Sequence, residues 1–330
     1  MILKTWQGFA LLSIALLIAA GCGDDKGNGP IDNPYDRINL DLFVVAPLGA
    51  GMVYELWVSP KSGLAAATDD WVSVVRFDVI AGTGGTEAQL VNEDGFLISD
   101  TLSGIGVDLE DYDSIFVTIE PSPDNDSMPS GSIYFSGDID LSTTTFVVLE
   151  FPGTHLQTLN SDAFFTYTTP TDEDTTEANE LGGVWFMLAT RQDPGLFGLQ
   201  PAPDGWIYEG WAKLGDTLLS TGRFASPDGA DQGNPYSGML SAPLYPGEDF
   251  LQGSPRSGLF PYVFQSTDTI MVTVEPVDDP LPATPFPYII YVNRPGQTPT
   301  NFQNFRLDKR DAADGAYPEG HAVILRRSTG

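Results

Sequence analysis

The chain carries one pattern of aromatic and charged residues twice, in the same order. The pattern is Tyr-Glu-x-Trp, followed by Arg-Phe and by a β-branched segment that ends in Thr-x-Glu-Pro. Its members are Tyr54, Glu55, Trp57, Arg76 and Glu120 in the first copy, and Tyr208, Glu209, Trp211, Arg223 and Glu275 in the second. The separation from the Tyr to the Glu that precedes Pro differs by a single residue between the copies. Because repeated self-similarity marks a repeated structural unit, the pattern predicts an internal duplication.

Both copies consist of short segments rich in β-branched and aromatic residues, which predicts β-strands. Apolar and polar residues alternate in Val72–Val79 and near Ile270–Val274, as in a strand with one buried face. Turn sequences such as Pro203-Asp204-Gly205 separate the segments. No segment shows the apolar spacing and caps of an amphipathic helix. The expected fold class is all-β, with two tandem antiparallel β-sandwich domains.

The repeat also predicts how the chain is divided. We expect a signal peptide at residues 1–21, a flexible tether at 22–36, a first β domain at 37–154 and a second at 155–330. The second domain should end in a basic tail, which contains Arg294, Arg306, Lys309, Arg310, Arg326 and Arg327. We expect these cations to pair with the acidic body of the protein; a tail that docks on a partner is the alternative.

The N-terminus has the features of an exported lipoprotein. Lys4 precedes the apolar run Phe9–Ala20, which is too short to span a bilayer comfortably. Small residues then lead directly to Cys22, the only cysteine of the chain, and polar residues follow it. This arrangement resembles a bacterial lipobox, with Ala19 where Leu is preferred. We therefore predict cleavage before Cys22 and attachment of diacylglycerol and a further acyl chain such as palmitate.

A lipidated Cys22 predicts both location and covalent chemistry. The lipid would hold the protein at a bilayer without a transmembrane helix, so the membrane is an expected partner. No thiol would remain to form a disulfide. We expect a cell-envelope protein that faces the periplasm or the cell surface. Gly23 stands where some proteobacteria read an Asp that retains lipoproteins at the inner membrane, which favours the outer membrane.

The net charge argues against several classes of partner. The chain has 15 Lys and Arg against 45 Asp and Glu, a formal net charge of −30. Such a surface repels phosphate backbones, so we expect no nucleic-acid binding. The charge is typical of a protein kept soluble by repulsion between molecules. Weak binding of divalent cations is the alternative.

The repeated aromatic residues have a structural and a functional interpretation. Tyr54 and Trp57 lie three apart, as do Tyr208 and Trp211, so a flat strand would place the members of each pair on opposite faces. We expect each Trp in a core and each Tyr at its rim. The alternative is an exposed aromatic residue that stacks on a sugar.

The repeated charged residues also predict structure rather than catalysis. We expect Glu120 to pair with Arg76, and Glu275 with Arg223, or to accept other hydrogen bonds at the end of its strand. A glycosidase would instead use two carboxylates across a cleft, with Glu55 and Glu120 or their second-copy equivalents as candidates. The acidic segments Asp124-Asn125-Asp126 and Asp278-Asp279 are interpreted as turns, although they offer oxygen ligands to Ca²⁺.

No motif of a nucleophile, metal or cofactor site is present. The two histidines, His155 and His321, are not accompanied by a ligand pattern, and there is no Gly-x-Ser-x-Gly or phosphate-binding loop. We therefore predict no catalytic residue, no metal site and no cofactor.

The second copy resembles the extracytoplasmic C-terminal domain of anti-sigma-K (RskA-type) factors. The resemblance lies in Gly205–Trp211, Leu219–Phe224, Tyr245–Phe250 and Ile270–Pro276, and the first copy shares it more loosely. It implies a β-rich sensory or scaffold domain. The cytoplasmic sigma-binding domain and transmembrane helix of those factors are replaced here by the lipoprotein signal.

The expected function is a non-enzymatic, lipid-anchored envelope protein that serves as a binding or structural module. Its partner would be an envelope protein or a glycan. One alternative is an envelope sensor that regulates a sigma-factor pathway through a membrane protein. The other is a glycan-binding or carbohydrate-active protein.

Overall fold

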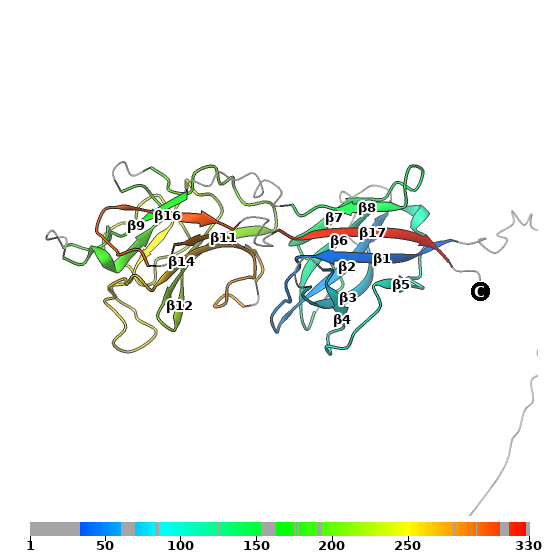
Figure 1. The fold of residues 1–330 in the computed structure, drawn as a ribbon, viewed down its shortest axis with the longest axis horizontal. Helices are drawn as coiled ribbons and strands as arrows, with labels where there is room; N and C mark the ends of the chain where they lie inside the picture. Colours follow the sequence, from blue (N-terminus) through cyan, green and yellow to red (C-terminus); the bar gives the residue numbers. More distant parts are fainter. Residues whose placement is uncertain are drawn as a thin grey trace, which may run out of the picture.

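The computed structural model describes residues 34–327, except for 61–69, 83–85, 153–162, 190–192, 311–316 and the positions 125, 175, 177, 280 and 295. The described part is all-β. Its sheets are antiparallel, and it contains short 3₁₀ helices but no α-helix. The strands form two lobes that lie end to end (Figure 1). The predicted signal peptide, most of the predicted tether and Cys22 lie outside the described residues.

The first lobe consists of two sheets packed as a sandwich. The four-stranded sheet has the order β5-β1-β17-β8, and the five-stranded sheet has the order β4-β3-β2-β6-β7. The first sheet contains β1 (Tyr35–Phe43), β5 (Thr101–Ser103), β8 (Phe146–Leu149) and β17 (Glu319–Arg326). The second contains β2 (Met52–Pro60), β3 (Val72–Ile80), β4 (Gln89–Val91), β6 (Tyr112–Pro121) and β7 (Ile133–Asp138). The 3₁₀ helix η3 (Leu109–Asp111) precedes β6.

Side-chain alternation explains how the sandwich forms. In β1 every second residue is buried, including Ile38, Leu40 and Leu42, so one face of this strand turns to the core. In β2 all residues from Met52 to Ser59 are buried, because both faces of this central strand are covered. Single bridges between Ser136 and Glu150 and between Phe43 and Glu87 join the sheets at their edges.

The second lobe is one eight-stranded antiparallel sheet with the order β12-β11-β14-β15-β16-β9-β10-β13. The end strands β12 and β13 approach each other, so the sheet curls into a nearly closed barrel. Its strands are β9 (Ala163–Thr166), β10 (Gly183–Trp185), β11 (Trp206–Leu214), β12 (Thr217–Phe224), β13 (Gly247–Asp249), β14 (Thr269–Pro276), β15 (Ile289–Asn293) and β16 (Asn304–Lys309). The 3₁₀ helix η5 (Glu180–Gly182) leads into β10.

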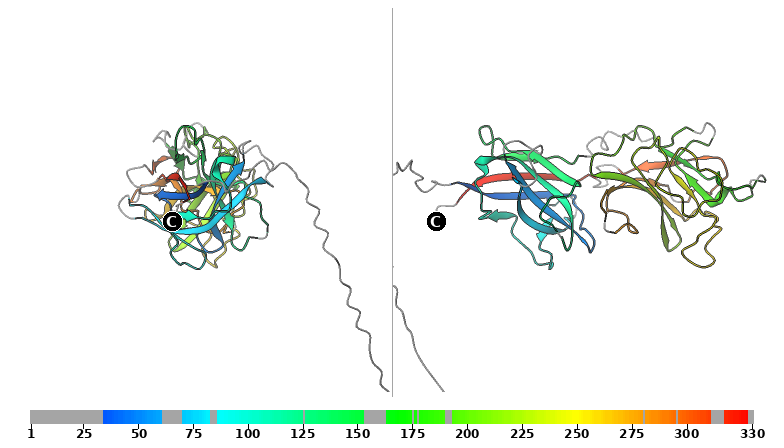
Figure 2. Two further views of the ribbon diagram at one scale, coloured as in Figure 1. Left: turned by 90° about the vertical axis from the view of Figure 1, so that its right-hand side faces the viewer. Right: turned by 180° about the vertical axis from the view of Figure 1, so that it is seen from behind.

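The chain passes between the lobes twice. It leaves the first lobe after β8, forms β9 to β16 in the second lobe, and returns as β17. In the first lobe β17 lies between β1 and β8, antiparallel to both, and Figure 2 shows it beside β1 from behind. The prediction that these residues are a tail of the second domain is therefore wrong. In β17 every second residue is buried, including Ala322 and Ile324, as expected for a strand with one face on a core. This pattern explains why the segment completes a sheet of the first lobe.

Charge pairs fasten the returning strand beside the start of β1. The Arg327 guanidinium lies 2.6 Å from the carboxylate of Asp36, and the Arg327 N–H donates to the carbonyl oxygen of Pro34 over 2.8 Å. Arg326 stacks on the ring of Tyr35 at 4.1 Å. Tyr35 and Asp36 are thus part of a strand, whereas we expected them in the tether. The pairing of basic C-terminal residues with the acidic body is confirmed for Arg326 and Arg327, because Arg326 also lies 3.6 Å from Glu110.

The position that β17 fills in the first lobe is filled by β9 in the second. β17 lies antiparallel between β8 and β1, and β9 lies antiparallel between β16 and β10. β9 precedes the other strands of its lobe in the sequence, whereas β17 follows all of them. The four-stranded sheet of the first lobe is therefore completed by β17, which follows the strands of the second lobe in the sequence.

Aromatic side chains and one close backbone contact join the lobes. Tyr134 and Phe151 of the first lobe pack on Trp206 of the second, with ring centroids 6.1 and 5.7 Å apart. The Trp206 indole N–H donates to the carbonyl oxygen of Ile133 over 2.9 Å. Gly205 has a positive φ of 80°, and a Cβ there would lie 1.8 Å from the Gly131 oxygen. Only glycine permits this approach.

Candidate functional site

The repeated residues occupy matching places in the two lobes. Tyr54 pairs with Phe77 across β2 and β3, and Tyr208 pairs with Phe224 across β11 and β12. The register of each strand pair shifts just before the Trp, which marks a β-bulge at the same point in both lobes. A second shift precedes the Thr of the Thr-x-Glu-Pro segment in both lobes.

Both members of each aromatic pair are buried, so the prediction of a Tyr at the rim is wrong. Tyr54 and Tyr208 are 1% and 0% exposed, and Trp57 and Trp211 are 2% and 1% exposed. The tyrosines belong to the main core, and the tryptophans lie on the other face of the sheet, where further side chains cover them. Each tyrosine hydroxyl donates to the carbonyl oxygen eight residues earlier, over 2.8 Å in the first lobe and 3.0 Å in the second. No aromatic platform for a sugar is formed by these residues.

Each buried Trp starts the same chain of hydrogen bonds. The Trp57 indole N–H donates to the Thr118 hydroxyl over 2.9 Å, and Trp211 donates to Thr273 over the same distance. Each threonine hydroxyl then donates to the glutamate two residues later, Glu120 or Glu275. A backbone N–H from the following loop donates to the same carboxylate, from Ser130 in the first lobe over 2.8 Å and from Phe286 in the second over 2.9 Å.

The Arg–Glu pair exists, but its glutamate is a different one from the predicted Glu120. Arg76 donates to Glu55 over 2.7 Å, because these residues face each other directly across β2 and β3. Arg76 also contacts Glu93 at 2.9 Å and Asp124 at 3.1 Å. Glu120 is instead satisfied by Thr118 and the Ser130 N–H.

The second lobe keeps the pair in a looser form. Arg223 and Glu209 are again opposite each other, with 3.6 Å between the guanidinium and the carboxylate. The Arg223 guanidinium donates to the carbonyl oxygens of Pro276 and Val277. One guanidinium nitrogen of Arg223 and one Glu209 oxygen are buried without a hydrogen bond.

Burial is the largest cause of the pKa shifts of the repeated glutamates. It raises the pKa of Glu55, Glu120 and Glu209 above the usual range, and it raises the pKa of Glu275 to about 8. Glu120 and Glu275 are 2% and 0% exposed. Their oxygens accept internal hydrogen bonds from threonine hydroxyls and backbone N–H groups.

The acidic segments after the Glu-Pro pairs form turns, as predicted. The carboxylate of Asp124 accepts from the Asp126 N–H over 3.0 Å, and that of Asp279 accepts from the Leu281 N–H over 2.7 Å. Within the described ranges, no group of three or more His, Cys, Asp and Glu side chains has a geometry that suits a metal ion.

Sequence reasoning missed a set of buried carboxyls in the second lobe. Glu248 and Asp249 in β13 are both 0% exposed, and their partners are hydroxyl, indole and backbone N–H groups. Burial raises the pKa of Glu248 to about 8 and that of Asp249 to about 6. It also raises the pKa of nearby Asp231 to about 7. The acid-rich segments gave no signal of this, because exposed acids are common in a chain with this charge.

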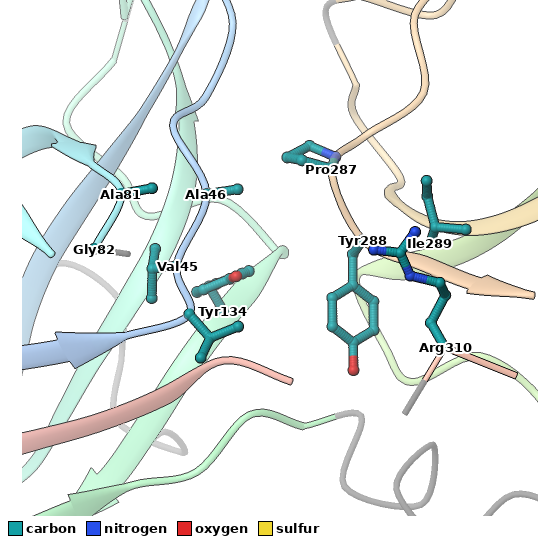
Figure 3. A pocket seen from close by; sticks show the side chains of 10 residues that line it. Val45, Ala46, Ala81, Gly82, Tyr134, Pro287, Tyr288, Ile289 and Arg310 are labelled. Atoms are coloured by element: carbon teal, nitrogen blue, oxygen red, sulfur yellow. The ribbon is translucent and has the colours of Figure 1, made fainter. Parts of the chain in front are cut away.

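A pocket of about 240 Å³ lies between the lobes. Its first-lobe wall comes from the segment after β1, the end of β3 and Tyr134, and its second-lobe wall comes from Pro287, Tyr288, Ile289 and Arg310 (Figure 3). Tyr288 is 4% exposed, and its hydroxyl has no hydrogen-bond partner. No motif indicates this pocket, because its walls come from segments that lie far apart in the sequence.

A smaller pocket of about 220 Å³ has Glu120, Asp124, Asp126 and Asp278 in its wall. It thus brings both acidic turns to the same junction. No cation is among the residues that line it, although Arg76 contacts Asp124 at 3.1 Å, and the described acids form no group that suits a metal ion.

Two further observations concern the membrane and related proteins. No helix among the residues that the structure describes is both long and apolar enough to cross a bilayer. Comparison with protein-family models, with curated proteins and with solved structures finds no match to this chain.

Proposed function

We propose that this protein is a lipid-anchored, non-enzymatic component of a bacterial cell envelope that serves as a binding or structural module. The observation that carries the proposal is that the repeated polar residues form hydrogen bonds and ion pairs within the protein. In both lobes the Trp, Thr and Glu side chains bond to one another and the Arg bonds to its own lobe, so these side chains have partners within the protein.

We also propose that the two lobes descend from one duplicated β unit. The proposal is supported by the shared strand neighbours, the paired β-bulges and the matching Trp–Thr–Glu hydrogen bonds. A bulge at an equivalent position is hard to obtain by chance, because it depends on a single extra residue in one strand. In this proposal β17 of the first unit and β9 of the second are equivalent strands.

The relation to anti-sigma-K ectodomains remains a proposal about ancestry and fold. A protein held outside the cytoplasm cannot bind a sigma factor directly, so any regulatory role would pass through a membrane protein. The glycan-binding alternative is weakened by the burial of Trp57 and Trp211, which leaves neither ring free to stack on a sugar.

The proposed anchor is tested by metabolic labelling with an alkyne analogue of palmitate. The native chain should incorporate the label and remain with the membranes, and a Cys22→Ala variant should lose both properties. A Ser13→Ala variant within the apolar run is the matched control and should behave like the native chain. Label in the Cys22→Ala variant would contradict the anchor.

The partner class is tested by cross-linked pull-down of the native lipidated chain from solubilised envelopes, with the Cys22→Ala form as control. Recovery of a membrane-spanning signalling protein would favour the sensor alternative. Recovery of a soluble envelope protein or of peptidoglycan would favour the binding or structural role.

A further inference from the structure

We propose that an exposed loop of the second lobe, residues 236–246, binds a cationic amphipathic segment of a partner protein. This inference deepens the proposed binding role and rests on it. Within this apolar loop, which joins β12 to β13, Met239, Leu240 and Leu244 are 92%, 47% and 75% exposed. Contact of large aliphatic side chains with water is unfavourable, so their gathering in one exposed loop indicates an interaction surface.

The apolar loop lies in a stretch of sequence without charge. From Gln232 to Gly247 the chain contains no Asp, Glu, Lys or Arg, although charged residues make up 18% of the whole chain. Burial of a charge is costly unless the charge is paired. A partner could therefore cover this loop without desolvating any charge of the loop itself.

The backbone of the apolar loop is held by the lobe behind it. The Gly238 N–H donates to the Thr171 hydroxyl over 2.7 Å, and the Leu240 N–H donates to the Thr171 carbonyl oxygen over 2.8 Å. The Ser237 hydroxyl donates to the buried carboxyl of Glu248. A Cβ on Gly238 would lie 2.2 Å from the Thr171 oxygen, so only glycine permits this approach. The exposed side chains are thus presented on a fixed backbone, which lowers the entropic cost of binding.

Acidic residues follow Thr171 and lie beside the apolar loop. They form the segment Asp172-Glu173-Asp174, and the Asp172 Cα is 3.1 Å from where a Cβ on Gly238 would lie. Glu173 is exposed. In the described part of the chain, no Lys or Arg forms an ion pair with these three acids. The surface thus combines apolar side chains with negative charge that no described cation neutralises.

Charge complementarity favours a cationic amphipathic partner over a second copy of this chain. A second copy has the same net charge of −30 and would bring the same acids against each other. A segment with apolar side chains on one face and Lys or Arg at its border would match both parts of the surface.

The position of the second lobe favours a partner protein over the anchored bilayer. Figure 1 shows the two lobes end to end, with the C-terminus beyond the free end of the first lobe. The start of β1 lies at that same end, because Tyr35 pairs with Arg326 of β17. The chain from the proposed anchor at Cys22 therefore enters the first lobe at the end away from the second lobe.

The test uses three fluorescent peptides of equal length. One has Leu on one helix face and Lys on the other, the second has Glu in place of Lys, and the third has Ser in place of Leu. Each is titrated with the full-length lipidated protein in zwitterionic lipid nanodiscs and followed by fluorescence anisotropy, with empty nanodiscs as reference. We expect the Leu/Lys peptide to bind saturably and at least about tenfold more tightly than the other two.

Two kinds of result would overturn the proposal. One is binding of the Leu/Lys peptide to empty nanodiscs alone, because the bilayer would then be its only partner. The other is equal binding of the Ser/Lys or the Leu/Glu peptide, because charge alone or apolar contact alone would then explain the affinity.

Variants locate the site on the protein. Leu244→Ser should weaken the Leu/Lys peptide about tenfold without lowering the melting temperature, because this side chain lies largely in water. Glu173→Gln should weaken it about threefold at low salt and less at high salt, since salt screens exposed charges. Unchanged affinity of Leu244→Ser would overturn the assignment to the apolar loop, and unchanged affinity of Glu173→Gln would overturn the charge complementarity.

Two control variants should leave the affinity for the Leu/Lys peptide undiminished. Phe96→Ser changes an exposed apolar residue that lies near Glu93 and Asp94 in the sequence of the first lobe. Arg256→Gln removes an exposed cation from the segment that follows β13. Weakening by Phe96→Ser as large as that by Leu244→Ser would overturn the choice of surface, and weakening by Arg256→Gln would contradict a cationic partner. Failure of all peptide binding leaves palmitate labelling at Cys22 and the pull-down unaffected, so the two proposals fail distinguishably.

Discussion

In the first lobe Arg76 contacts three carboxylates and donates to one backbone carbonyl, whereas the equivalent Arg223 in the second lobe contacts one carboxylate and donates to two backbone carbonyls. The second lobe instead buries carboxyls such as Glu248 and Asp249 among hydroxyl and N–H donors without any cation. Both arrangements occur in each lobe, since Glu120 has no cation partner and Glu209 faces Arg223, but the second lobe buries more acids without a cation. Ion pairing depends on ionised groups, whereas burial without a cation raises the pKa of a carboxyl and so favours its protonated form.

The largest difference between the lobes is the strand that closes them, and deleting it should have the largest effect. A chain ended before Glu319 loses β17, which exposes the core residues Ile38, Leu40 and Leu42 and leaves β1 and β8 without their shared neighbour. The lost packing exceeds the stability of a typical domain, about 5–15 kcal/mol. We expect the first lobe to unfold and the second to stay folded.

Limited proteolysis with fragment mapping by mass spectrometry measures this. Cleavage should spread through residues 35–150, while residues 163–309 should remain resistant. A chain ended after Arg327 keeps the pairing with Asp36 and is the control. Protection of the first lobe in the shorter chain would contradict the structural role of β17.

The second difference predicts responses to pH that differ in size between the lobes. Burial raises the pKa of Glu248 and Glu275 to about 8 in the folded second lobe, above the usual unfolded value near 4. An acid whose pKa is raised by folding contributes its full stabilisation at a pH below its unfolded pKa. This contribution is lost as the pH rises through the folded pKa, which is about 8 here. The denaturant concentration at the unfolding midpoint of the second lobe should therefore decrease as the pH is raised from 6 to 9. The first lobe should change less, because the contacts of Arg76 lower the pKa of Glu55 and so partly offset the effect of burial.

Matched variants sharpen the pH prediction. Glu275→Gln removes a carboxyl that must ionise while buried, so it should reduce the loss of stability between pH 6 and pH 9 by at least about 1 kcal/mol. Glu120→Gln changes the equivalent residue in the first lobe and should have a smaller effect. Chemical denaturation at several pH values measures both. A pH dependence unchanged by Glu275→Gln would exclude this residue as its source.

The sequence was sufficient to predict strands and turns, because these depend on local patterns. Alternation in Val72–Val79 and the Pro203–Gly205 turn were informative for that reason. The sequence failed where distant segments meet. The flat-strand argument placed Tyr54 at a rim, because it could not foresee that both faces of β2 are covered. The return of β17 also left no local signal, since its alternation suits either lobe.

The candidate site shows the same limit. The Arg–Glu pair was predictable as a pair, but the choice of Glu55 over Glu120 depends on which strands are neighbours. The pocket between the lobes depends on the position of Tyr288 opposite Tyr134, which only the assembled fold provides.

The next largest difference in stability is expected between variants of the equivalent arginines Arg76 and Arg223. Arg76→Gln leaves the buried Glu55 beside two other acids, so it should destabilise the first lobe by about 2–3 kcal/mol. Arg223→Gln should destabilise the second lobe by only about 1 kcal/mol, because its pair is longer. Urea unfolding followed by lobe-specific proteolysis compares them. High salt should reduce the difference between the variants, since screening weakens the partly exposed contacts of Arg76. Equal losses would show that the additional carboxylates of Arg76 contribute nothing.

The smallest predicted difference is between the two buried tryptophans. Trp57→Phe and Trp211→Phe each remove one indole N–H bond to a threonine and part of a ring with the same burial. Each should destabilise its lobe by about 1–2 kcal/mol, and the two values should agree within about 0.5 kcal/mol. Urea unfolding monitored by proteolysis measures each value, and addition of Thr118→Val or Thr273→Val tests whether the hydrogen bond is the source. A loss confined to one lobe would mean that matching geometry conceals unequal packing, and it would weaken the proposed common origin of the Trp–Thr–Glu arrangement.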